Sequence, residues 1–126
     1  MKEYNMENER PKTLFVDIDG TLLYHFGTGN TQSTIDPEVL PGVIEKFDEW
    51  DRKGYKLILV TGRRESERFA TIKQLRKVGI VYDDLIMGLG GGTRVLINDN
   101  KPDSDNPTAL AICIKRNEGI SNINLI

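Results

Sequence analysis

Short apolar segments alternate with helical segments along the first two-thirds of this 126-residue chain. Residues 13–18 and residues 55–60 are mostly apolar runs of a length that suits buried strands. Residues 41–53 and 65–78 carry apolar side chains at helical spacing, and a glycine follows each segment directly. Because parallel strands need a crossover connection, this alternation predicts an α/β domain with a mainly parallel sheet.

Three more short apolar runs, at residues 85–87, 95–98 and 109–114, bring the expected sheet to about five strands. The length of the chain suits one domain, so we expect a single Rossmann-like, three-layer domain over residues 13–126. Residues 1–12 are mostly polar and are expected to form a flexible tail. The apolar faces expected to pack on the sheet consist of Val43, Ile44, Phe47 and Trp50 in the first helix, and of Phe69, Ile72 and Leu75 in the second.

The composition indicates a globular protein with a mildly acidic surface, because the chain has 17 Lys and Arg residues and 19 Asp and Glu residues. Nothing in this balance indicates a nucleic-acid partner. The chain has neither an apolar leader nor a segment long enough to cross a membrane, so a cytoplasmic protein without a membrane partner is expected. A single cysteine, Cys113, excludes a disulfide framework and is expected to be a small buried apolar residue.

The strongest chemical signal is Asp17-Ile18-Asp19-Gly20-Thr21, directly after the first apolar run. Residues two apart in an extended chain point to the same side, so Asp17 and Asp19 can face one ligand. A carboxylate can attack phosphorus, and two neighbouring carboxylates are compatible with a shared cation such as Mg²⁺, which prefers oxygen ligands. The alternative interpretation is a solvated acidic turn or a calcium-binding loop.

This motif resembles the first motif of the haloacid dehalogenase (HAD) superfamily of phosphohydrolases, and the resemblance runs from about residue 13 to about residue 111. The resemblance implies that Asp17 is the nucleophile. It implies that Asp19 protonates the leaving oxygen and later deprotonates the attacking water. It also implies that Mg²⁺ binds to the Asp17 carboxylate and to the backbone carbonyl of Asp19, while Gly20 lets the chain turn beneath the phosphate.

Two other stretches match later motifs of that superfamily. Thr61-Gly62-Arg63 follows the second apolar run and resembles the second motif, in which a hydroxyl holds a phosphate oxygen and Arg63 could reach the phosphate or the substrate. An ordinary turn with a solvated arginine is the alternative there. Asp99 directly follows the run at residues 95–98 and resembles the acid of the fourth motif, which implies a third Mg²⁺ ligand.

The third motif departs from the superfamily pattern. Small relatives often carry Gly-Lys-Pro after the third strand, whereas this chain has a glycine-rich stretch without lysine at residues 88–92. We expect Lys101, two residues beyond Asp99, to supply the missing cation, with a solvated turn lysine as the alternative. Arg94 is expected to begin the fourth strand roughly 16 Å from Asp99, and Lys73 is expected to lie too far along the second helix.

Neither gap between motifs can hold a cap domain, and residues 22–36 suffice only for a small flap. The chain is thus similar to capless HAD phosphatases, among them small proteins linked to surface-polysaccharide and sugar-phosphate metabolism. The resemblance predicts a Mg²⁺-dependent phosphomonoester hydrolase that acts through an aspartyl-phosphate on a small phosphorylated metabolite, such as a sugar phosphate.

Several alternatives to this function stay open. They are a catalytically impaired phosphate-binding protein, a receiver-like signalling domain and a phosphotransferase. A receiver carries its phosphorylated aspartate after the third strand, where this chain has no acid. A capless site open to water also predicts a homo-oligomer in which a neighbouring subunit covers the flap at residues 22–36.

Overall fold

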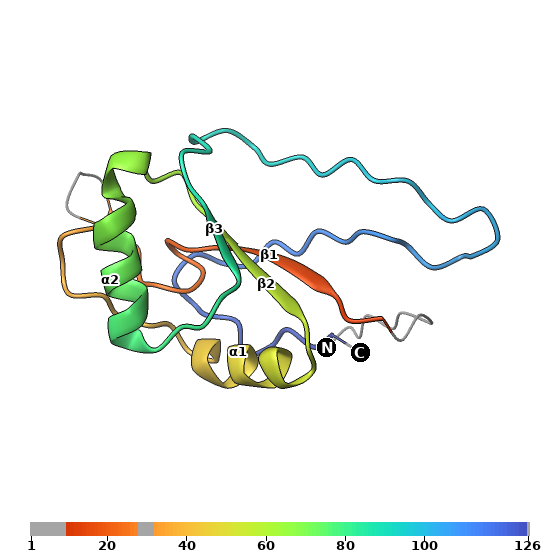
Figure 1. The fold of residues 1–126 in the computed structure, drawn as a ribbon, viewed down its shortest axis with the longest axis horizontal. Coiled ribbons are helices and arrows are strands. Elements are labelled where there is room, and N and C mark those ends of the chain that lie inside the picture. Colours follow the sequence, from red (N-terminus) through yellow and green to blue (C-terminus); the bar gives the residue numbers. More distant parts are fainter. Residues whose placement is uncertain (1–9, 28–31, 126) are drawn as a thin grey trace.

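The computed structural model describes residues 10–27 and 32–125, so most of the expected tail and part of the expected flap lie outside the described residues. Strands and helices alternate in the order that the sequence predicts (Figure 1). The elements are β1 (Thr13–Asp17), α1 (Val43–Arg52), β2 (Lys56–Val60), a short 3₁₀ turn η1 (Glu65–Glu67), α2 (Arg68–Val78) and β3 (Asp84–Ile86). None of the helices in the described ranges is long and apolar enough to cross a membrane.

The three strands form a parallel sheet in the order β1-β2-β3, which confirms the α/β class. Asp17 at the end of β1 pairs in register with Val60 at the end of β2, and Val60 pairs with Ile86 of β3. The carboxyl ends of all three strands therefore lie on one rim. Open parallel sheets bind ligands on this rim.

Helix α1 contributes the largest side chains of the core. Phe47 and Trp50 are almost fully buried, with ring centroids 5.6 Å apart. Leu57 and Leu59 of β2 and Leu75 of α2 belong to the same buried cluster. Residues two apart in a strand share a face, so Leu57 and Leu59 mark the side of the central strand that the core covers.

Helix α2 buries only part of the face expected, because Phe69 is 82% exposed. Leu75 is buried and Ile72 packs against the core as expected, whereas Thr71 and Gln74 are buried where Phe69 was expected. Phe69 precedes Thr71 by two residues, which rotates it by about 200° around the helix and points it to solvent. The expectation for Phe69 was wrong because two polar residues, rather than an aromatic one, occupy the inner face.

The sheet has three strands within residues 10–27 and 32–125, and the expected strands at residues 95–98 and 109–114 do not form. Residues 88–115, which we call the arm, instead run out from β3 and back as a long irregular loop (Figure 1). Val95 and Ile97 are 77% and 90% exposed, and Cys113 is exposed rather than buried. An apolar run becomes a strand only when it pairs with a neighbour, and these two runs pair with none of the described strands.

We predict that Phe47→Ala lowers the free energy of unfolding by about 3–5 kcal/mol, because it opens a cavity in the core. Phe69→Ala should change it by less than about 0.5 kcal/mol, because that ring is largely in solvent. Urea unfolding followed by circular dichroism measures both values. Equal losses in the two variants would contradict the orientation of α2.

Candidate active site

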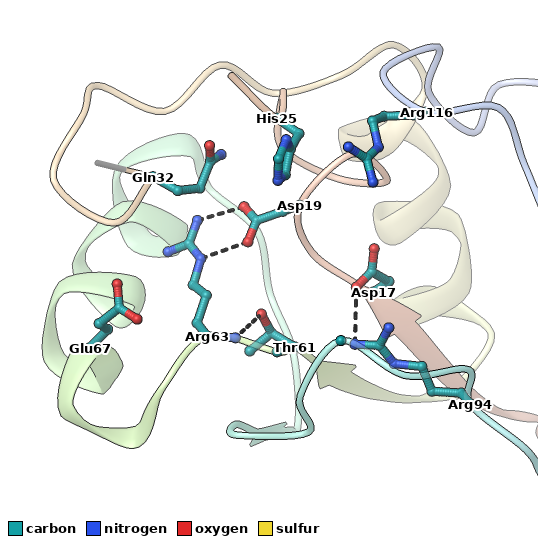
Figure 2. A pocket seen from close by; sticks show the side chains of 11 residues that line it. Asp17, Asp19, His25, Gln32, Thr61, Arg63, Glu67, Arg94 and Arg116 are labelled. Carbon is teal, nitrogen blue, oxygen red and sulfur yellow. Dashed lines mark hydrogen bonds and ion pairs between the residues drawn. The ribbon is translucent and has the colours of Figure 1, made fainter. Parts of the chain in front are cut away.

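A pocket of about 370 Å³ opens on the rim formed by the carboxyl ends of the strands (Figure 2). Its residues come from the end of β1, the turn after β2, the segment before α1, the arm and the chain beyond the arm. The lining residues are Asp17, Asp19, His25, Gln32, Thr61, Gly62, Arg63, Glu67, Gly91, Arg94 and Arg116.

Asp17 is the last residue of β1 and its carboxylate is 41% exposed. The Thr21 hydroxyl donates a hydrogen bond of 3.1 Å to one carboxylate oxygen, and Nη2 of Arg94 lies 4.0 Å from the other. Burial raises the pKa of Asp17 above its ordinary value, while Thr21 and Arg94 act in the opposite direction. The two partners thus favour the ionised carboxylate, which is the form that can act as a nucleophile.

Asp19 forms a two-point ion pair with Arg63 (Figure 2). Nε and Nη2 of Arg63 donate to the two carboxylate oxygens at 2.9 and 2.8 Å, and the Arg63 side chain is only 4% exposed. The remaining nitrogen, Nη1, donates to Thr71 at 2.9 Å and to Gln74 at 2.6 Å. Thr71 and Gln74, the buried polar residues of α2, therefore hold the Arg63 guanidinium, and Arg63 in turn holds Asp19.

The turn after β2 fixes the start of the arm. The backbone amides of Gly88 and Leu89 donate to the carbonyls of Arg63 and Thr61 at 2.7 and 3.1 Å. A Cβ on Gly62 would lie 2.8 Å from the carbonyl oxygen of Gly90, so only glycine allows this approach. Residues 88–92, the glycine loop, therefore lie against the Thr61 turn, and the chain leaving this loop brings Arg94 to the pocket.

The chain returns from the arm to the same site through Asn117. Its backbone amide donates to the Gly20 carbonyl at 2.8 Å. Its side chain accepts from the backbone amide of His25 at 2.7 Å and donates to the His25 carbonyl at 3.1 Å. Asn117 has φ 64°, a conformation that asparagine tolerates better than most residues. These hydrogen bonds of Asn117 place Arg116 beside the turn that follows β1.

Residues 1–94 match a protein-family model described as "HAD superfamily, subfamily IIIB (Acid phosphatase)". The chain belongs to this family. The resemblance of the Asp17 motif to HAD phosphatases is therefore confirmed for three-quarters of the sequence. The matched region ends at Arg94, so Arg116 and Asn117 lie beyond it.

Two solved structures are similar to this HAD protein. A chain of "Structure of Pnkp1/Rnl/Hen1 complex" is 31% identical with a TM-score of 0.56, and the match covers 67% of this chain and 30% of that chain. A chain of "Structure of the Pnkp1/Rnl/Hen1 RNA repair complex" is 30% identical with a TM-score of 0.55, and the match covers 66% and 27%. The HAD protein thus spans less than a third of the chains it matches, and no curated protein matches it significantly.

The structure brings most of the site residues expected from the HAD motifs together, but not all of them. Asp17, Asp19 and the Thr61 turn share the pocket, although Arg63 is bound to Asp19. Asp99 and Lys101 are exposed on the arm and do not line the pocket. Arg94, expected at the opposite edge of the sheet, lies beside Asp17, so that geometric expectation was wrong. The error followed from treating residues 95–98 as a strand.

The donor set on this rim is small. Within the described ranges, no group of three or more His, Cys, Asp and Glu side chains could hold a metal ion. Mg²⁺ often binds through one or two carboxylates and takes its other ligands from water and substrate phosphate. The Asp17 carboxylate and the neighbouring Asp19 carbonyl fit such a site, whereas Asp99 lies on the arm.

We predict that Gly62→Ala displaces the glycine loop and lowers the free energy of unfolding by about 1–3 kcal/mol, the usual cost of overpacking. Gly92→Ala is the matched control, because a Cβ there meets no atom within 4 Å. Thermal unfolding of the two variants measures the difference. Two equally stable variants would show that the loop does not lie against the Thr61 turn.

We also predict that Arg63→Gln costs about 3 kcal/mol of stability, because it leaves Asp19 and two polar side chains of α2 without their partner. Arg52→Gln removes an exposed ion pair with Asp48 and should cost less than about 1 kcal/mol. Urea titrations of both variants supply the comparison. A small effect at Arg63 would mean that the network contributes little.

Proposed function

We propose that this protein is a magnesium-dependent phosphomonoester phosphatase in which Asp17 is the nucleophile and Asp19 the general acid and base. The observation that supports this most directly is that both side chains line one pocket, Asp17 at the end of β1 and Asp19 held two residues later by Arg63. Membership of an acid phosphatase family of the HAD superfamily supports the same chemistry.

In the first step, a carboxylate oxygen of Asp17 forms a bond to phosphorus while the ester P–O bond breaks. The proton of Asp19 passes to the leaving oxygen. In the second step, Asp19 removes a proton from water, the water oxygen bonds to phosphorus, and the bond between phosphorus and Asp17 breaks. Inorganic phosphate leaves, and both carboxyl groups regain their starting states.

Arg63 fixes the plane of the Asp19 carboxylate through this cycle. It binds each oxygen once, so the remaining position on one oxygen can carry the proton that is transferred on the substrate side. Thr61 lines the same pocket, and its hydroxyl oxygen accepts a hydrogen bond of 3.1 Å from the backbone amide of Arg63. Its hydroxyl proton remains available to a phosphate oxygen.

A bound Mg²⁺ would supply charge neutralisation between Asp17 and the substrate phosphate. The Asp17 carboxylate and the Asp19 carbonyl would hold it, with water and phosphate oxygens as the remaining ligands. The family is one whose superfamily generally uses this ion, which supports the proposal.

The substrate proposed is a small phosphorylated metabolite, such as a sugar phosphate, since the pocket is polar and the described chain adds no cap over it. The second candidate is the terminal phosphate of an RNA strand. It is favoured by the two similar chains, which belong to complexes titled with Pnkp1, Rnl and Hen1, one of them named an RNA repair complex. The same two carboxylates would serve either substrate.

We predict that Asp17→Asn abolishes phosphate release from p-nitrophenyl phosphate, because the amide is nearly isosteric but cannot attack phosphorus. Asp48→Asn, an exposed aspartate of α1, should retain wild-type activity. Excess chelator should silence the wild type, and added Mg²⁺ should restore it. Turnover by Asp17→Asn, or the absence of any wild-type turnover, would refute the mechanism.

A panel of sugar phosphates, nucleotides and oligoribonucleotides with 3′ or 5′ phosphates separates the two substrate classes. The metabolite proposal expects the highest kcat/KM on a small phosphate ester. A preference of tenfold or more for an oligoribonucleotide over every small ester would replace it with the RNA candidate.

A further inference from the structure

HAD chemistry needs a cation beside the transferred phosphoryl group, and the glycine loop of this chain has no lysine to supply one. A phosphoryl transition state spreads negative charge over three oxygens, so a fixed cation is among the larger catalytic contributions. Three arginines line the pocket: Arg63, Arg94 and Arg116. Which of them can meet a phosphate depends on what each already binds.

Arg63 is committed to other partners. Its guanidinium is buried and makes four hydrogen bonds, two to Asp19 and two to α2. Turning it toward a phosphate would break the pair that orients the proposed general acid. Arg63 therefore serves Asp19 and is not the phosphate-binding cation.

Arg94 is only loosely held. Its guanidinium is about half exposed and lies 4.0 Å from the Asp17 carboxylate, a longer separation than a hydrogen bond. A phosphate seated on Asp17 would come within reach of the same guanidinium. The planar fork of arginine suits two oxygens of such an anion.

Arg116 has no hydrogen-bond or ion-pair partner among the residues that the structure describes. Its side chain lies over Gly20, where an added Cβ would be 3.1 Å from Cγ and 3.7 Å from Nε. In Figure 2 its guanidinium points toward Asp17 from the side opposite Arg94. The absence of a side chain at Gly20 gives Arg116 this path into the pocket.

We propose that Arg94 and Arg116 form a two-arginine clamp that binds the phosphoryl group over Asp17 and replaces the missing lysine. The clamp rests on the proposed function for its catalytic role, but its binding of a phosphate dianion can be measured without turnover. Arg94 lies near the start of the arm, and Arg116 directly follows its last residue. The glycine loop and the hydrogen bonds of Asn117 bring the two arginines to the same pocket.

The test measures the binding of inorganic phosphate by isothermal titration calorimetry, in buffer with Mg²⁺, for the wild type and for Arg94→Gln, Arg116→Gln and the double variant. Each single variant should bind phosphate at least tenfold more weakly, and the double variant should bind none that is measurable. Lys115→Gln is the matched control, because its side chain is 84% exposed and pairs with Glu118. It should bind as the wild type does. Thermal unfolding confirms that every variant is folded.

The same proteins are assayed for kcat/KM on p-nitrophenyl phosphate, where each arginine variant should lose at least tenfold. If the wild type hydrolyses no ester but its phosphate affinity depends on both arginines, the clamp stands and the proposed function fails. If the wild type is active and either arginine variant keeps wild-type affinity and turnover, the clamp is refuted and the function stands. A wild type without phosphate affinity, or a loss at Lys101→Gln with silent arginine variants, also overturns the clamp.

Discussion

The two-point ion pair between Asp19 and Arg63 is the interaction on which the organisation of this site depends. It joins the turn after β1 to the turn after β2, and Thr71 and Gln74 connect the same guanidinium to α2. Gln74 then donates to the carbonyls of Gln32 and Ile35, so the network continues into the segment before α1. A buried arginine needs such partners, because an unpaired charge in the interior is costly. The polar inner face of α2 follows from this requirement.

Close backbone approaches do the rest of the positioning. The glycine loop lies on the Thr61 turn because Gly62 has no side chain, and Arg116 lies over Gly20 for the same reason. Asn117 binds the backbone of His25 on both sides, much as a neighbouring strand would. Side chains from three distant parts of the sequence consequently meet around Asp17, at the rim where parallel strands end.

The sequence predicts the part of this arrangement that depends on local pattern. Alternating apolar runs and helical segments locate β1, β2, β3 and both helices to within a few residues, and strand ends locate Asp17, Asp19 and Thr61. Composition and periodicity could not reveal that Phe69 faces solvent, because its inner neighbours are polar and are explained only by Arg63. The phosphate-binding role expected for Arg63 conflicts with its hydrogen bonds to Asp19, Thr71 and Gln74. The sequence could not reveal these bonds, because the partners lie in other elements.

The arm shows where local pattern fails. Residues 95–98 have the composition of a strand, but a strand also needs a neighbour to pair with, and after the glycine loop these residues run out along the arm without pairing with any described strand. The metal ligand expected at Asp99 rested on a resemblance to the fourth HAD motif at a strand end, and the cation expected at Lys101 rested on its position two residues beyond Asp99. Arg116 belongs to none of the motifs recognised in the sequence, and the turn around Asn117 brings it to the pocket.

The central claim is that Asp17 carries the phosphoryl group during turnover. The most direct test mixes Asp19→Asn protein with p-nitrophenyl phosphate and Mg²⁺, quenches the reaction in acid, and maps the modified peptide by mass spectrometry. Without the general base, hydrolysis of the intermediate should slow, and the phosphoryl group should be found on Asp17. Burst release of p-nitrophenol with the phosphoryl group on any other residue, or wild-type turnover with no Asp17-phosphate under any quench, would contradict the mechanism.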